Sequence, residues 1–118
     1  MPTFSIFAAA FLLASSVLCA PASADDDKML GPDEFPTTLD AVVKDILANM
    51  NDDDKNRLRN TRKDSLIDYH MGFGTYIRNH YGLWRGNTKL LVSACGKPCH
   101  PDDASMIIIE AVWAETQR

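Results

Sequence analysis

The clearest pattern in the chain is the spacing of apolar side chains in residues 39–50, which recur every three or four residues as on one face of an α-helix. Thr37 or Thr38 can cap the start of this helix, and Asp40 in its first turn is favoured by the helix dipole. The pattern therefore predicts an amphipathic helix. Its expected buried face consists of Leu39, Val42, Val43, Ile46, Leu47 and Met50.

The stretch 51–60 predicts a second, short helix. Asn51 can cap it, acidic residues fill its first turn and basic residues follow, which is the order that the helix dipole favours. Because Leu58 is its main apolar residue, we expect this helix to be mostly exposed.

Helical spacing of apolar residues returns over residues 62–81 and predicts a third, longer helix. Thr61 and Asp64 match a capping box, with aspartate in place of the usual glutamate. Gly72 and Gly74 lie inside this helix, where each glycine costs about 1 kcal/mol relative to alanine. We therefore expect another helix to approach closely at these glycines.

Two further helices are predicted after Gly82, which suits the position just past a helix end. Asn87 can cap the short apolar segment TKLLVSAC, and a last helix begins near Pro101 with acidic residues in its first turn. That helix is apolar on nearly all sides, although residues 107–109 also favour a strand. The sequence thus predicts an all-α fold: a single small domain of four to five short helices with a buried C-terminal helix.

Residues 1–24 are predicted to be a secretory signal peptide. An apolar run leads to Pro21 and then to the A-x-A pattern that ends at Ala24, and an acidic segment follows at once. The run is short for a membrane span. We expect cleavage near Ala24 and a periplasmic or secreted protein without a stable membrane anchor. A lipid anchor at Cys19 is disfavoured because the residue before it, Leu18, is not small.

The remaining chain divides into an acidic flexible arm over residues 25–34 and a helical domain over residues 35–118. The arm is rich in acids, proline and glycine. Charge is uneven along the chain: the segments up to residue 54, from 55 to 89 and from 90 onward carry −8, +6 and −2, which sum to the net −4. A weak net charge argues against a nucleic-acid partner. Opposite charges can pair within the fold, or can give a dipolar surface that steers a partner.

Cys95 and Cys99 are the only cysteines that follow the predicted signal peptide. In an oxidising compartment, so close a pair is most simply a disulfide. The alternative is covalent haem attachment, because Cys95 and Cys99 are followed by His100 as in c-type sites. The usual spacing has two residues between the cysteines, whereas this chain has three. The disulfide is therefore the favoured interpretation, and we expect no cofactor.

The stretch RNHYGLWRGN contains residue types that are enriched in protein–protein interfaces. Among these, tryptophan and arginine often contribute most of the binding free energy. We predict that Arg78, Asn79, Trp84, Arg85 and Asn87 bind a protein partner. In a competing interpretation, Trp84 enters the core together with Leu83, while Arg85 points into water.

Several polar residues have structural interpretations. Arg78 is expected to form a buried ion pair with Glu110 or Asp68. His70 is expected to be a core histidine with a backbone or carboxylate partner. The sequence has no G-x-S-x-G nucleophile pattern and no histidine spacing typical of zinc sites. We therefore predict no catalytic and no metal residues, although an enzyme built on His70, Arg78 and Glu110 stays open.

The segments FPTTLDAVV, LIDYHMGFGTYIRNHYGLWRGN and HPDDASMIIIEAVW together resemble a family of small bacterial domains of unknown function. The resemblance covers residues 35–113 and rests on F-P-x-T-L, G-x-x-I-R-N-x-x-G-L-W and H-P-D-D-A-S patterns. It implies a helical fold and no known activity. With the predicted export, it favours a non-catalytic domain that binds an unidentified protein in the periplasm, of an accessory, inhibitor or immunity type. The alternative is a small c-type haem protein.

Overall fold

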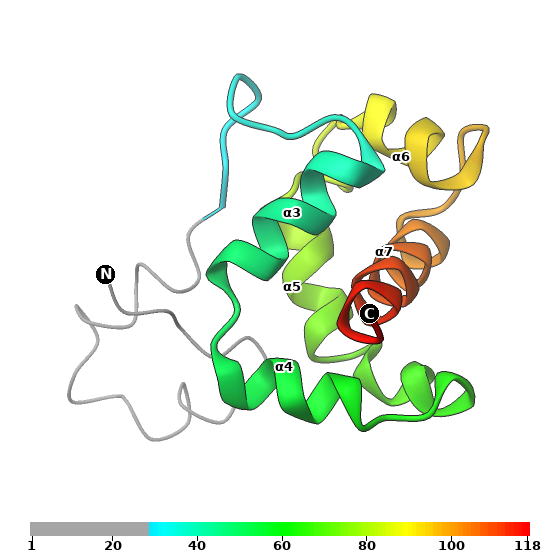
Figure 1. Cartoon of the computed structure of the whole chain (residues 1–118). Helices are drawn as coiled ribbons and strands as arrows, with labels where there is room; N and C mark the ends of the chain where they lie inside the picture. Colours follow the sequence, from blue (N-terminus) through cyan, green and yellow to red (C-terminus); the bar gives the residue numbers. More distant parts are fainter. Residues whose placement is uncertain (1–28) are drawn as a thin grey trace, which may run out of the picture.

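A computed structural model describes residues 29–118 (Figure 1). The predicted signal peptide and the first residues of the predicted arm lie outside these residues. The described elements are α3 (Leu39–Asn49), α4 (Asp52–Arg59), the 3₁₀ helix η2 (Lys63–Tyr69), α5 (Phe73–His80), α6 (Thr88–Cys95) and α7 (Pro101–Thr116). The prediction of a single all-α domain is confirmed over this part of the chain.

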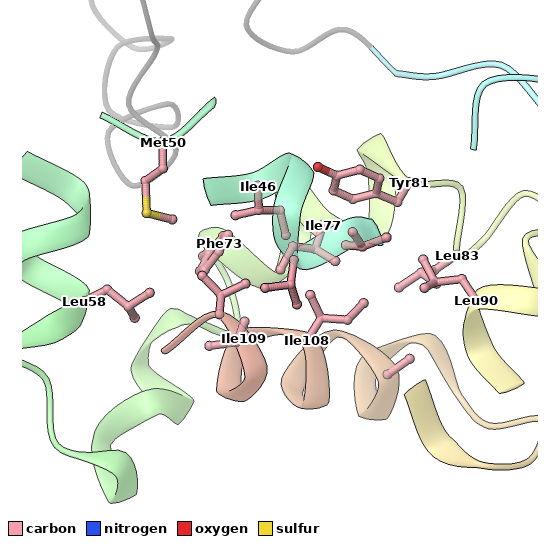
Figure 2. Close-up of a cluster of buried hydrophobic side chains, with 14 of the residues drawn as sticks. Ile46, Met50, Leu58, Phe73, Ile77, Tyr81, Leu83, Leu90, Ile108 and Ile109 are labelled. Atoms are coloured by element: carbon pink, nitrogen blue, oxygen red, sulfur yellow. The ribbon is translucent and has the colours of Figure 1, made fainter. Parts of the chain in front are cut away.

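The C-terminal helix α7 is the central element, because it packs against each of the other five helices. Figure 2 shows Ile108 and Ile109 extending from α7 into the cluster of buried side chains. The β-prone run at residues 107–109 is helical, since packing outweighs the local strand preference. The buried apolar residues are Val42, Val43, Ile46, Met50, Leu58, Leu66, Phe73, Ile77, Tyr81, Leu83, Leu90, Ala104, Ile108, Ile109 and Val112.

The predicted single helix over residues 62–81 is wrong, because the chain breaks into η2 and α5 at residues 70–72. The predicted capping box is also absent: Thr61 donates its hydroxyl hydrogen bond to the carbonyl of Arg57, and η2 has no side-chain cap. A Cβ added at Gly74 would lie 2.8 Å from Nη1 of Arg78. The nearest neighbour of that Cβ position is therefore an arginine side chain of the same helix, and the next is the backbone carbonyl of Tyr69 at the end of η2, at 3.5 Å.

Three predicted N-caps are confirmed. The side chains of Thr38, Asn51 and Asn87 accept hydrogen bonds from backbone N–H groups in the first turns of α3, α4 and α6. His100 caps α7 through Nδ1, which accepts from the backbone N of Asp102 at 3.0 Å. Capping thus fixes where four of the helices begin.

The disulfide between Cys95 and Cys99 is present and joins the end of α6 to the loop before α7. Residues 29–34, part of the predicted flexible arm, contact the domain. The backbone N of Leu30 donates to the carbonyl of His80 at 3.1 Å, and Leu30 packs against the core. Among residues 29–118, no helix has the length and apolarity that crossing a bilayer would require.

Gly82 follows α5 with a positive φ of 71°, as its sequence position predicts. A side chain at this position would overlap the ring of Phe35, which packs directly against the glycine. Gly86 also has a positive φ, of 95°, but no atom lies within 4 Å of the place that its Cβ would take.

These two glycines form a matched pair for a stability test. We expect Gly86→Ala to cost about 1–2 kcal/mol of unfolding free energy, which is the strain of a left-handed residue. Gly82→Ala should cost a further ~1–3 kcal/mol because it also displaces Phe35. Urea denaturation of both variants measures the difference. Equal losses would show that Phe35 does not restrict this turn.

The side chain of Tyr81 is fully buried, and its hydroxyl donates to Oδ2 of Asp45 in α3 at 2.6 Å. Figure 2 shows this ring at the edge of the cluster. Burial raises the pKa of Tyr81 well above its usual value, and the hydrogen bond to Asp45 raises it further.

Tyr81 should therefore weaken the fold at alkaline pH. An unfolded tyrosine loses its proton near pH ~10, whereas the folded Tyr81 keeps it, so the free energy of unfolding should fall by up to about 1.4 kcal/mol per pH unit above that value. Tyr81→Phe should remove this contribution and show a shallower fall in urea denaturation between about pH 9 and about pH 11. A fall as steep as in the parent protein would refute this assignment.

Candidate interaction surface around Trp84

The turn that joins α5 to α6 is closed by backbone hydrogen bonds. The carbonyl of Gly82 accepts from the backbone N of Arg85 at 2.9 Å and from that of Asn87 at 3.1 Å, and the backbone N of Leu83 donates to the carbonyl of Arg78. These bonds leave little freedom to the residues between them. The turn therefore presents its side chains in fixed directions.

Within this turn, Leu83 and Trp84 point in opposite directions. Leu83 is buried in the core, whereas Trp84 is 56% exposed. The interpretation that Trp84 enters the core with Leu83 is therefore wrong for Trp84, because Leu83 alone fills the apolar site beneath the turn. The indole of Trp84 contacts the ring of His100 edge to face, with 5.3 Å between ring centroids and an interplanar angle of 89°.

Arg78 is 6% exposed and lies inside the domain. Its Nη1 donates to Oγ of Ser105 at 2.9 Å, and its Nη2 donates to the carbonyl of His70 and to Oγ1 of Thr75. Its Nε lies 3.4 Å from Oδ1 of Asp102, at the start of α7. These contacts occupy the whole guanidinium group, which is therefore not available to a partner.

The predicted ion pair of Arg78 with Glu110 or Asp68 is wrong. Glu110 is exposed and pairs with Lys63 of η2 at 3.2 Å, two turns further along α7. The break at residues 70–72 allows α5 to cross the first turn of α7, and this crossing brings Arg78 to Asp102. The carbonyl of His70 accepts from Arg78, and the buried Nδ1 atom of its partly buried ring has no hydrogen-bond partner among residues 29–118.

Asn87 is 3% exposed, so its side chain is also not available at the surface. Its amide nitrogen donates to the carbonyls of Pro36 at 3.0 Å and Tyr81 at 2.8 Å, while its oxygen accepts from the backbone N of Leu90. This side chain joins the segment before α3 to the turn and caps α6. Its predicted role in partner binding is therefore replaced by a structural one.

Asn79 and Arg85 remain at the surface. Arg85 is exposed, and its side chain is held by backbone carbonyls: its Nη1 donates to the carbonyl of Leu30 at 2.9 Å and its Nη2 to that of Asn79 at 2.7 Å. The guanidinium also lies over the ring of Phe35, 5.2 Å from its centroid. Arg85 is thus an exposed cation held in one orientation.

The exposed residues that the turn and the start of α7 bring together are Asn79, Trp84, Arg85 and His100, and we call them the Trp84 surface. From the sequence, His100 was considered only as part of a haem site. Its place beside Trp84 depends on how α5, α6 and α7 pack, and no local pattern reveals it. The predicted disulfide was the one clue in the sequence, because it joins the end of α6 to the residue before His100.

The stretch of sequence between Asp68 and Asp102 carries only positive charge. No acidic residue occurs in the sequence between Asp68 and Asp102, whereas four basic residues do: Arg78, Arg85, Lys89 and Lys97. Because Arg78 is buried against Asp102, the other three supply the positive charge available at the surface.

The polar side chains beneath this surface bond to one another. Oγ of Ser105 donates to the carbonyl of Asp102 and accepts from Arg78, so its proton and one of its lone pairs are in use. Among residues 29–118, no three side chains of His, Cys, Asp or Glu converge in a way that could hold a metal ion. The two sulfurs that haem attachment would need as separate thiols, those of Cys95 and Cys99, are joined to each other.

The family model described as Domain of unknown function (DUF6794) matches residues 35–116, almost the same part of the chain as the resemblance noted from the sequence. No curated protein and no solved structure matches the chain.

The contact between Arg78 and Asp102 can be tested against a neighbouring acid. Asp102→Ala and Asp103→Ala both remove a carboxylate from the first turn of α7, which costs about 0.3–1 kcal/mol through the helix dipole. Asp102→Ala also leaves the buried Nε of Arg78 without its ion-pair partner, so we expect a further loss of about 1–3 kcal/mol.

Urea denaturation of the two variants measures this difference. Asp103 is the matched control because it is exposed and takes part in none of the ion pairs of residues 29–118. In an Arg78→Met background the difference between the two variants should disappear. If it persists there, the extra cost does not come from Arg78.

Proposed function

We propose that this chain, which belongs to the DUF6794 family, is an exported, non-catalytic helical domain that binds another protein through its Trp84 surface. The observation that carries the proposal is the 56% exposure of Trp84 on a turn that backbone hydrogen bonds hold closed. The family is described as a domain of unknown function, and the exposed surface itself supports the proposal.

Exposure of Trp84 contrasts with the other tryptophan of the chain. Trp113 packs against the core and donates its Nε1–H to the carbonyl of Thr61 at 2.8 Å. Trp84 instead leaves more than half of a large apolar ring in water, which is unfavourable unless a partner covers it. Tryptophan is among the residues that contribute most to protein interfaces, and a ring that is already fixed loses little entropy on binding.

The charges around Trp84 indicate what kind of partner would fit. Arg85 lies next to it in the turn, and Lys89 and Lys97 are exposed on the following helix and loop. A protein surface that offers a recess for the indole and carboxylates around it would be complementary. Such charges mainly accelerate association and set specificity, and their effect falls with salt.

The proposed compartment is the periplasm or the extracellular space. The disulfide between Cys95 and Cys99 supports it, because disulfides persist in oxidising compartments, and the A-x-A pattern at Ala24 adds to it. Accessory subunits, inhibitors and immunity proteins are the kinds of exported binding protein we consider, by analogy only.

The first test is capture of a partner from periplasmic extract by the oxidised protein, followed by purification of that partner and measurement of its Kd. Trp84→Ala should weaken binding by about thirtyfold or more, as expected for a central interface residue worth at least ~2 kcal/mol. Ile67→Ala is the matched control, because Ile67 is 61% exposed but lies on η2, outside the turn that joins α5 to α6. Equal affinity of Trp84→Ala and the parent protein would overturn the proposal.

Fluorescence gives an independent readout. In a Trp113→Phe variant, Trp84 is the only tryptophan, so its emission should shift to shorter wavelength when the purified partner covers the ring. Unchanged emission at saturating partner would mean that binding occurs on another face. Raising the salt concentration should weaken binding mainly through a slower association rate.

A further inference from the structure

A second feature of the domain lies on the other side of the segment that Arg85 holds. It is a pocket of about 340 Å³ whose walls come from three parts of the chain: α3, α5 and the segment 30–36. Its lining residues are Leu30, Glu34, Pro36, Asp45, Asn49, Tyr76 and His80. Nothing in the proposed protein-binding role uses it.

The helices supply the pocket with two pairs of side chains one turn apart. Asp45 and Asn49 lie at i and i+4 on α3, and Tyr76 and His80 lie at i and i+4 on α5, so each pair shares one helix face. The rings of Tyr76 and His80 stack, with 4.9 Å between centroids and 14° between planes. The pocket therefore has an aromatic wall that faces a polar one.

Two carboxylates in this pocket, those of Asp45 and Glu34, form no ion pair with a lysine or arginine among residues 29–118. Asp45 accepts from the hydroxyl of Tyr81 at 2.6 Å and from the amide of Asn49 at 3.4 Å, and Glu34 accepts from the backbone N of Gly31 at 2.8 Å. Each carboxylate can accept about four hydrogen bonds, so both keep unused acceptor sites.

The buried hydroxyl of Tyr81 orients Asp45, because it holds Oδ2 from the side of the core. Leu30 and Pro36 make the remaining wall apolar. Negative charge, aromatic faces and a short apolar wall together suit an organic cation, since ammonium and guanidinium groups bind both carboxylates and ring faces. A metal ion such as Ca²⁺ or Mg²⁺ requires several oxygen ligands that converge on one point. Among residues 29–118, no three side chains of His, Cys, Asp or Glu are placed to hold a metal ion.

We propose that this pocket binds a ligand with an ammonium or guanidinium head on a short aliphatic stem. The head lies between Asp45 and Glu34, and the stem runs along Leu30 and Pro36. The volume is near the lower end of ligand pockets, so it fits a group the size of a lysine or arginine side chain and excludes a nucleotide. The same chemistry is offered by a free alkyl diamine and by a lysine of another polypeptide.

The test is a titration of the oxidised full chain followed by two-dimensional amide NMR. The probes are n-butylammonium and n-butylguanidinium, with n-butanol as the neutral probe of the same shape. The two cations should shift the side-chain amide of Asn49 and the backbone amides of residues 30–36 with saturable, millimolar affinity, and n-butanol should not. Equal shifts with n-butanol, or no saturation with either cation, would overturn the proposal.

Matched variants separate the pocket from general negative charge. Asp45→Asn and Glu34→Gln keep the shape and an acceptor oxygen but remove the charge, so each should weaken n-butylammonium binding about tenfold. Asp40→Asn removes one charge from the same helix α3 outside the pocket, where Asp40 pairs only with Lys44, and should change binding less than about twofold. If Asp40→Asn weakens binding as much as Asp45→Asn, the cation associates with the acidic surface and the proposed site is wrong.

Two further probes identify the source of the cation. Diaminobutane represents a free diamine, and N-acetyl-lysine methylamide represents a lysine within a polypeptide. Saturable binding of either probe, seen at the same amides, supports the site. The probe with the lower Kd identifies the source of the cation. Failure of both would overturn the proposal, and it would leave protein binding at Trp84 untouched because the two sites share no lining residue.

Discussion

The guanidinium of Arg78 is the contact on which the arrangement of the surface depends. Its donors reach the carbonyl of His70 at the chain break, Thr75 within α5, and Ser105 on α7, while its Nε meets Asp102. One buried cation thus fixes how α5 crosses the first turn of α7. Because His100 caps that turn, the same contact determines where His100 lies relative to Trp84.

The glycine at position 74 follows from this use of Arg78. A Cβ there would lie 2.8 Å from Nη1, so only glycine leaves the guanidinium its present place against α5. A buried charge of this kind adds little stability compared with an apolar side chain of the same shape, but it selects one geometry among several similar packings. In this domain the selected geometry is the one that leaves Trp84 outside and Leu83 inside.

Local patterns in the sequence predicted what depends on neighbouring residues. The faces of α3 and α7, the caps at Thr38, Asn51 and Asn87, and the disulfide follow from spacing and cap chemistry within one segment, and the structure has them all. The break at residues 70–72 did not follow, because apolar side chains keep nearly the same spacing through a 3₁₀ turn as through an α-helix.

The misplaced residues of the candidate site depend on distant parts of the chain or on the backbone of a turn. Asn87 was correctly assigned as a cap, but the carbonyl of Pro36 that draws its amide inside lies 51 positions away in the sequence. Arg78 was correctly assigned as a buried ion pair, but which acid it meets depends on a helix crossing. Trp84 and Leu83 are adjacent in the sequence, and the backbone of a turn, which apolar periodicity does not report, decides which of them faces water.

Arg85 connects the two proposed binding sites. It belongs to the Trp84 surface, and it donates to the carbonyl of Leu30, which lines the pocket proposed to bind an organic cation. A connection is not yet a coupling, because coupling requires an element with two arrangements that both ligands favour differently. The contacts of Arg85 are with backbone carbonyls and with the ring of Phe35, and Phe35 is itself held against Gly82. These contacts define one rigid arrangement, so a cation in the pocket and a protein on Trp84 should bind independently, the pocket adding a second specificity to the domain without regulating the first.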